Sequence, residues 1–197
     1  GSYMRDEVFD FIKVANEFYG DVFRVLLLGN HKDDEIVKDC QRVGVSSTII
    51  SHCFVPHSEV ADYMGLADFA ITPFIPVPSK RYGSPIKNGE YWAMGLPVVI
   101  PPNISDDSDI IEKYNIGSII QELNDDCYEK AIKKIDFILS NETSDERFER
   151  IRSVAIKYRS FEIAEKVYAQ IYNSSGNTVG SEFKVNTTTT GSQWLPH

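Results

Sequence analysis

The sequence predicts an α/β protein with a Rossmann-like, doubly wound parallel sheet that ends in helices. Apolar runs of strand length alternate with amphipathic helical segments as far as about residue 120. Some of these runs, such as FRVLLLGN at residues 23–30, are continuously apolar, as in strands that are covered on both faces. From about Asp125 the pattern is helical only. Strands that alternate with helices of this length indicate crossover connections and therefore a parallel sheet.

The predicted elements follow one another with short connections. Gly20 and Gly44 close the first two helices, since glycine is a common helix stop. The expected strands are residues 23–30, 46–54, 68–74, 96–102 and 116–120. The expected helices are residues 6–20, 31–44, 56–67, 84–95, 106–115, 125–140, 144–158 and 160–173.

The chain is predicted to form one domain and a tail. Residues 1–172 form the Rossmann-like domain, and a domain of ~150 residues buries enough surface to make a core without disulfides or metals. Residues 173–197 are rich in Ser, Thr, Gly and Asn and show no periodicity. We therefore expect a flexible tail outside the fold, which could include tag-derived residues.

Composition and charge exclude several classes of protein. The formal net charge of −9 argues against nucleic-acid binding, which needs an extended basic surface. Cys40, Cys53 and Cys127 lack any C-x-x-C spacing, which indicates reduced thiols of a cytoplasmic protein rather than disulfides or a zinc site. No apolar run approaches the ~20 residues that span a bilayer, although peripheral membrane contact stays open.

The stretch SPIKNGEYWAMGLPVV, residues 84–99, places two opposite charges at the start of an apolar helix. Ser84 before Pro85 is typical of a helix start, so Lys87 and Glu90 fall within the first two turns. The helix dipole disfavours a lysine there and attracts anions, so Lys87 indicates an external anion such as a diphosphate. Glu90 could then accept hydrogen bonds from hydroxyls of the same ligand. A surface Lys87–Glu90 ion pair of about 0.3 kcal/mol is the alternative.

This segment resembles the donor site of glycosyltransferase family 4, where a Ser-Pro-x-Lys step precedes Glu-Tyr-x-Ala-x-Gly-x-Pro-Val-Val. The resemblance runs collinearly over about residues 3–172, through FRVLLLGN, FVPHSEVADYMGLADFAITPF, DDSDIIEKYNIGSII and SFEIAEKVYAQIY. It implies the C-terminal half of a GT-B glycosyltransferase, the domain that holds the nucleotide-sugar donor. Chemistry in that family retains the anomeric configuration and needs neither a bound metal nor a cofactor besides the donor substrate.

Position by position, the resemblance also implies roles for individual residues. Lys87 would contact the donor diphosphate and stabilise its departure, and Glu90 would bind the ribose hydroxyls, so these two are the expected catalytic residues. The remaining expected donor contacts are in three places. Gly29 and Asn30, after the first strand, would border the pocket, and Phe54 and Val55 would hold the nucleotide base. Tyr82, Gly83 and Ser84 would lie near the phosphate and the sugar.

Two departures from the family pattern bear on the expected activity. Tyr82 stands where many members have a glutamate close to the transferred sugar. The strand and basic Gly-Arg...Lys-Gly loop that open the family's donor domain are expected to be missing or truncated here, with Arg5, Lys80 and Arg81 as the nearest basic residues. Without the N-terminal acceptor domain or a partner chain that replaces it, we expect this chain alone to be inactive.

The main hypothesis is therefore the donor-binding domain of a retaining, metal-independent glycosyltransferase. It would move a sugar from a UDP-, GDP- or ADP-sugar to a glycan or glycolipid acceptor, in the cytoplasm and with peripheral membrane contact as an option. Two alternatives stay open: a non-catalytic binding or scaffold module of the same fold, and a sugar-nucleotide epimerase, whose acidic residues in the cleft have no matching set here. His31, His52 and His57 belong to no metal-binding or catalytic motif.

Overall fold

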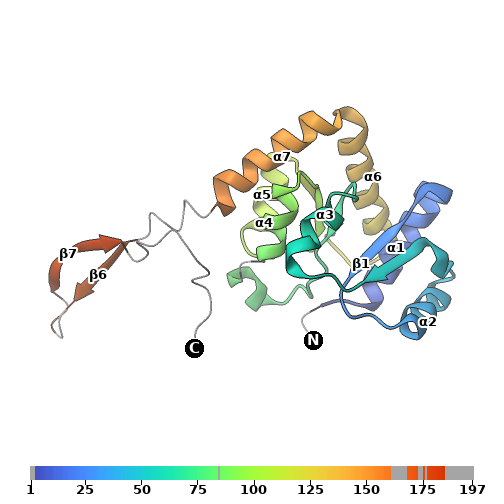
Figure 1. The fold of residues 1–197 in the computed structure, drawn as a ribbon, viewed down its shortest axis with the longest axis horizontal. Coiled ribbons are helices and arrows are strands. Elements are labelled where there is room, and N and C mark those ends of the chain that lie inside the picture. Colours follow the sequence, from blue (N-terminus) through green and yellow to red (C-terminus); the bar gives the residue numbers. More distant parts are fainter. Residues whose placement is uncertain (1–2, 84, 161–167, 173–174, 176, 185–197) are drawn as a thin grey trace.

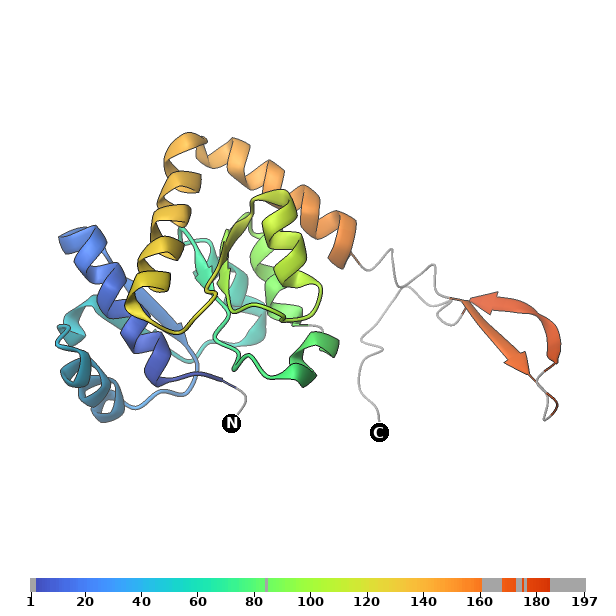
Figure 2. The same ribbon diagram turned by 180° about the vertical axis from the view of Figure 1, so that it is seen from behind.

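The computed structural model describes residues 3–83, 85–160, 168–172, 175 and 177–184. In these ranges seven α-helices pack around short parallel strands (Figures 1 and 2). The parallel strands are β1 Val25–Leu28, β2 Ile50–Cys53, β3 Ala70–Ile71, β4 Val98–Ile100 and β5 Gly117–Ile119. The helices are α1 Asp6–Tyr19, α2 Asp33–Val43, α3 Val60–Met64, α4 Ile86–Ala93, α5 Asp107–Tyr114, α6 Asp125–Asn141 and α7 Ser144–Arg159. Each lies where the sequence predicts a strand or helix.

The five parallel strands are hydrogen-bonded in two groups, ordered β1-β2 and β3-β4-β5. β1 pairs with β2 from Val25 opposite Ile50 onward, and β4 lies between β3 and β5, with Val98 opposite both Ala70 and Gly117. Glycine is required at the last of these positions, since a Cβ on Gly117 would lie 2.0 Å from the Val98 carbonyl oxygen. The predicted α/β class with parallel strands is confirmed.

Strand β1 is less buried than its continuous apolar sequence predicts. All four of its residues are half-buried, whereas Val98, Val99 and Ile100 of β4 are fully buried. The reason is the number of neighbours: β4 is paired on both edges, and β1 on one edge in the part of the chain that the structure describes. At the start of the chain, the Met4 amide donates to the Pro73 carbonyl at 2.8 Å, just beyond β3.

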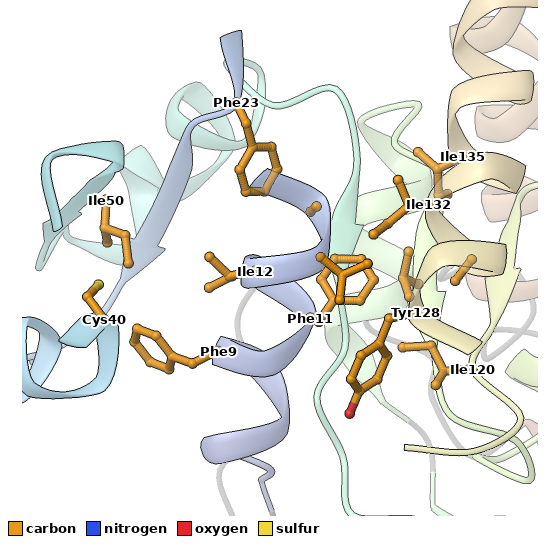
Figure 3. Close-up of a cluster of buried hydrophobic side chains, with 14 of the residues drawn as sticks. Phe9, Phe11, Ile12, Phe23, Cys40, Ile50, Ile120, Tyr128, Ile132 and Ile135 are labelled. Carbon is orange, nitrogen blue, oxygen red and sulfur yellow. The ribbon is translucent and has the colours of Figure 1, made fainter. Parts of the chain in front are cut away.

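Two apolar clusters hold the helices on the strands. The first is centred on α1, where Phe9 lies toward Cys40 of α2 and Phe11 lies beside Tyr128 of α6 (Figure 3). The rings of Phe11 and Tyr128 meet edge to face with centroids 5.8 Å apart, a favoured aromatic geometry. The second cluster joins Trp92 of α4 to buried apolar residues of β4, α5 and α7. Helix α1 thus joins the β1-β2 pair to α6, and α4 is fastened to the β4 side.

Helices α6 and α7 begin at side-chain caps. The Asn124 side chain accepts a hydrogen bond from the Cys127 amide at 2.9 Å, and Thr143 and Glu146 form a reciprocal capping box. Helix α7 then packs along α4, as Figures 1 and 2 show. Its last residue, Arg159, therefore arrives beside the first turn of α4.

Beyond Arg159 the structure differs from the sequence-based prediction. A helix is predicted over residues 160–173, but β6 Tyr168–Tyr172 pairs antiparallel with β7 Thr178–Lys184. The helix prediction is wrong for residues 168–172, and residues 161–167 lie outside the described residues. The tyrosines and the isoleucine of YAQIY also favour strands, and β7, which falls within the predicted tail, supplies the partner.

Candidate functional site

Helix α4 lies beyond the carboxyl end of β3, where open α/β sheets bind their ligands. A short 3-10 helix, Pro78–Tyr82, leads from β3 toward it. Pro85 is the N-cap residue and α4 begins at Ile86, one residue later than predicted, while Ser84 lies outside the described residues. The Asn88 amide donates to the Pro85 carbonyl at 3.1 Å. The Pro85 side chain carries no hydrogen-bond acceptor, so it does not cap the N–H groups of Ile86 and Lys87, which stay open to an anion.

Lys87 and Glu90 both lie within the first two turns of α4, as predicted. The Lys87 side chain is exposed and that of Glu90 is half-buried. Among the described residues, neither side chain forms a hydrogen bond or an ion pair, with the other or with a third residue. The Lys87–Glu90 surface ion pair, the alternative that the spacing left open, is therefore not formed.

The residue between these charges, Asn88, is fully buried and is the polar link that the sequence reasoning missed. Its Oδ1 accepts a hydrogen bond from the Thr72 hydroxyl, just after β3. Its Nδ2 donates to Asp107 Oδ2 of α5 at 2.6 Å. The one signal for this role in the sequence was an amide four residues before Trp92, on the face of α4 that is expected to point inward.

Asp107 is also fully buried and pairs with Arg159 at the end of α7, whose guanidinium also contacts Asp106 at 2.6 Å. Burial raises the pKa of Asp107, and the hydrogen bond from Asn88 and the charge of Arg159 offset part of that rise. Burial also opposes the charge of Asp106, but hydrogen bonds from Arg159 and Ser105 outweigh it and lower its pKa. Together these residues join β3, α4, α5 and α7 in one buried polar network.

The other predicted donor contacts also lie at carboxyl ends of strands. Gly29 follows β1, and its amide donates to the Cys53 carbonyl at the end of the neighbouring β2 at 2.9 Å. This pairing brings the loop of Gly29 and Asn30 beside the turn of Phe54 and Val55. Phe54 is 70% exposed, and Tyr82, at the end of the 3-10 helix before α4, is 90% exposed. Gly83 next to it is also exposed.

Comparison with known proteins identifies the family and the fold. The sequence profile of the family described as "Glycosyl transferases group 1" matches residues 3–139. The chain belongs to the group 1 glycosyltransferases. Among solved structures, the fold is similar to that of "WaaG, a glycosyltransferase involved in lipopolysaccharide biosynthesis", with a TM-score of 0.55 and 17% sequence identity. The similarity covers 78% of this chain and 38% of the WaaG chain. No curated protein matches the sequence.

The fold is accordingly that of a GT-B glycosyltransferase domain. As a match at 17% identity, WaaG shows the architecture and says nothing about individual site residues. The chain spans well under half the length of that relative, 38%.

The basic residues that the sequence places nearest the candidate site are mostly engaged. Arg81 donates to Asp109 at 2.8 Å and to the Ser105 carbonyl at 3.0 Å. Arg5 is held by Asp39 and Glu35 on α2. The Lys80 ammonium lies 4.9 Å from the centre of the Phe74 ring. Lys87 is therefore the cation near α4 that neither an acid nor a ring holds within the described ranges.

Other surface features lie away from α4. One hollow is lined by residues of α5, β5 and α6 and another by charged residues of α1 and α2, and neither contains Lys87 or Glu90. His52 contacts Asp33 at 2.6 Å beside His31, whose pKa burial and His52 lower. No group of three metal-ligating side chains occurs among the described residues. None of the described helices combines the length and apolarity needed to cross a membrane.

Proposed function

We propose that this domain binds the nucleotide-sugar donor of a retaining, metal-independent glycosyltransferase that extends a glycan or glycolipid. The observation that carries the proposal is the exposed Lys87, free of an acidic partner among the described residues, in the first turn of α4. A cation at that place opposes the helix dipole unless an anion binds there. A diphosphate would be bound by both the ammonium group and the N–H groups of the helix terminus.

The remaining roles follow from where each residue lies around α4. Glu90, one turn deeper, would accept hydrogen bonds from the ribose hydroxyls. The exposed Phe54 would stack on or border the base, together with Val55, because aromatic rings at a binding surface offer apolar area. Gly29 and Asn30 would approach the phosphates. Tyr82, Gly83 and Ser84 would border the transferred sugar, as the family resemblance implies.

In this proposal the chemistry is leaving-group stabilisation. When the bond between the sugar and the diphosphate breaks, negative charge develops on the departing oxygen, and Lys87 with the helix terminus would stabilise it without a metal ion. The acceptor would come from a second domain or a partner chain facing α4, so this chain alone would bind the donor without transferring the sugar. The whole enzyme would work in the cytoplasm, with or without contact to a membrane surface.

Calorimetric or NMR titration with UDP, GDP and ADP tests the proposal. We expect one of them to bind and Lys87→Ala to weaken that binding about tenfold or more, since a charge-assisted contact contributes ~1.5–3 kcal/mol. Lys130→Ala is the matched control, because that lysine is exposed on α6 far along the chain. Equal affinities for the wild type and Lys87→Ala, or no binding at millimolar concentration, would refute the assignment.

A further inference from the structure

Asn88 and Gly89, the two residues between Lys87 and Glu90, both contact other elements through the inner face of α4. Asn88 is 0% exposed, and both polar atoms of its side chain are used, by Thr72 and by Asp107. A buried amide that has one acceptor and one donor in place has a single satisfied orientation. Its neighbours on α4 are therefore held at defined angles around the helix axis.

Gly89 lets α7 approach the same face. A Cβ on Gly89 would lie 3.1 Å from Arg159 Cβ and 3.2 Å from Arg159 Cγ, closer than an ordinary contact. The Arg159 guanidinium lies 5.5 Å from the centre of the Trp92 ring, one turn further along α4. The end of α7 thus rests directly on the residues that separate the two charged side chains.

The polar network therefore controls two degrees of freedom of α4. The contacts of Asn88 with Thr72 and Asp107 oppose rotation of the helix about its axis, because rotation would leave buried polar groups without partners. The contact of Arg159 with Gly89 and Trp92 opposes translation along the axis. Lys87 lies next to Asn88 in the chain and outside the core, so its direction follows from that of Asn88.

We propose that Asn88 is a positioning residue of the donor site, which aims Lys87 and Glu90 at one ligand through its buried contacts with Thr72 and Asp107. This inference rests on the proposed function, in which both charged residues contact the donor. Asn88 itself does not touch the donor. Its effect on binding passes through Lys87.

The decisive variant is Asn88→Leu, which keeps a similar shape and removes both hydrogen bonds. We expect it to weaken binding of whichever of UDP, GDP and ADP the wild type binds by about tenfold. Thr72→Val, which removes one of the two bonds without changing the shape, should give a smaller loss and provides a readout if Asn88→Leu does not fold. Ser108→Ala is the matched control: this buried hydroxyl bonds to Pro101 and Ile104, away from α4, so its loss lowers the melting temperature but not the affinity.

A double-mutant cycle separates positioning from a general loss of stability. In the Asn88→Leu background, Lys87→Ala should cost little further affinity, because a misdirected Lys87 no longer contacts the ligand. The inference is wrong if the reductions in affinity caused by Asn88→Leu and by Lys87→Ala are independent, so that the double mutant shows their product. It is also wrong if Asn88→Leu and Thr72→Val both bind the nucleotide as the wild type does. If Lys87→Ala has no effect in the wild type, the proposed function itself fails instead.

Amide hydrogen exchange gives a readout that needs no ligand. Asn88→Leu should speed exchange of the α4 amides selectively, while those of α6 keep their wild-type protection. Unchanged exchange in α4 would show that Asn88 does not hold the helix and would overturn the inference even where no nucleotide binds.

Discussion

Asn88 Nδ2 of α4 donates a hydrogen bond of 2.6 Å to Asp107 Oδ2 of α5, and neither side chain is exposed to solvent. The other carboxylate oxygen of Asp107 contacts Arg159 of α7. A single buried carboxylate therefore connects the helix that carries Lys87 to two other helices. Its removal leaves an amide and part of a guanidinium without partners.

Asp107→Leu should consequently destabilise the domain by about 2–3 kcal/mol. Breaking a buried ion pair costs ~3–5 kcal/mol, and we place this variant lower because Asp106 continues to pair with Arg159. Urea unfolding followed by circular dichroism measures the change. Asp109→Leu is the control, since this exposed acid on the same helix pairs with Arg81 at the surface and should change little. Equal effects of the two variants would contradict the prediction.

The helices and strands that the sequence predicts correctly are those marked by nearby residues, such as a helix-closing glycine or a short apolar run. Gly44 closes α2 with φ of +74°, a left-handed conformation that favours glycine, and the apolar VVI becomes the fully buried β4. The half-burial of β1 could not be predicted, because burial depends on which strand pairs with each edge. The strand at residues 168–172 was missed because the same apolar residues satisfy a helical spacing, and pairing with β7 decides between the two.

The site was predictable to a similar degree. Lys87 could be singled out because a lysine in a first turn opposes the helix dipole, a property of the local sequence. Asn88 could not, since its partners Thr72 and Asp107 are 16 and 19 residues away and Arg159 is 52 residues beyond Asp107. Such contacts come from packing of α4 against α5 and α7, which periodicity does not encode.

Tyr114 should titrate well below an ordinary tyrosine. Its hydroxyl lies 2.9 Å from Lys157 Nζ and 2.8 Å from the Tyr158 hydroxyl, and these hydrogen bonds lower its pKa to about 8. The folded state favours the phenolate, so this group's contribution to stability is complete above the ordinary value of ~10 and is lost as the pH falls through about 8.

A titration of phenolate absorbance measures this pKa. Lys157→Met should raise the pKa of Tyr114 back toward ~10, because it removes the strongest of the hydrogen bonds that stabilise the phenolate. Lys113→Met is the control, since Lys113 lowers the pKa of Tyr114 through its charge rather than through a hydrogen bond and should give the smaller shift. A midpoint that does not move in Lys157→Met would refute this origin of the low pKa.

In the described part of the chain, β1, β2, β3 and β5 each have one unpaired edge. In the described ranges β1 is paired on one edge with β2, and β3 on one edge with β4, and an unpaired strand edge can accept a further strand. Tyr3 forms an antiparallel bridge with Phe74, and the Met4 amide donates to the Pro73 carbonyl, so residues added before Tyr3 would start close to the carboxyl end of β3. Its unpaired edge leaves β1 half-buried.

Adding a strand-length apolar segment before residue 1 should therefore stabilise the domain. We expect it to raise the melting temperature by several degrees, since each kcal/mol is worth ~2–4 °C in a chain of this size, and to slow amide exchange in β1. A polar segment of equal length that contains proline is the control, because proline cannot complete the hydrogen-bond ladder. If both additions leave the melting temperature and the β1 exchange rates alike, the unpaired edges of β1 and β3 do not accept a strand. A gain limited to the apolar segment, with the protein still monomeric in light scattering, would show that the added strand pairs within its own chain rather than between two copies.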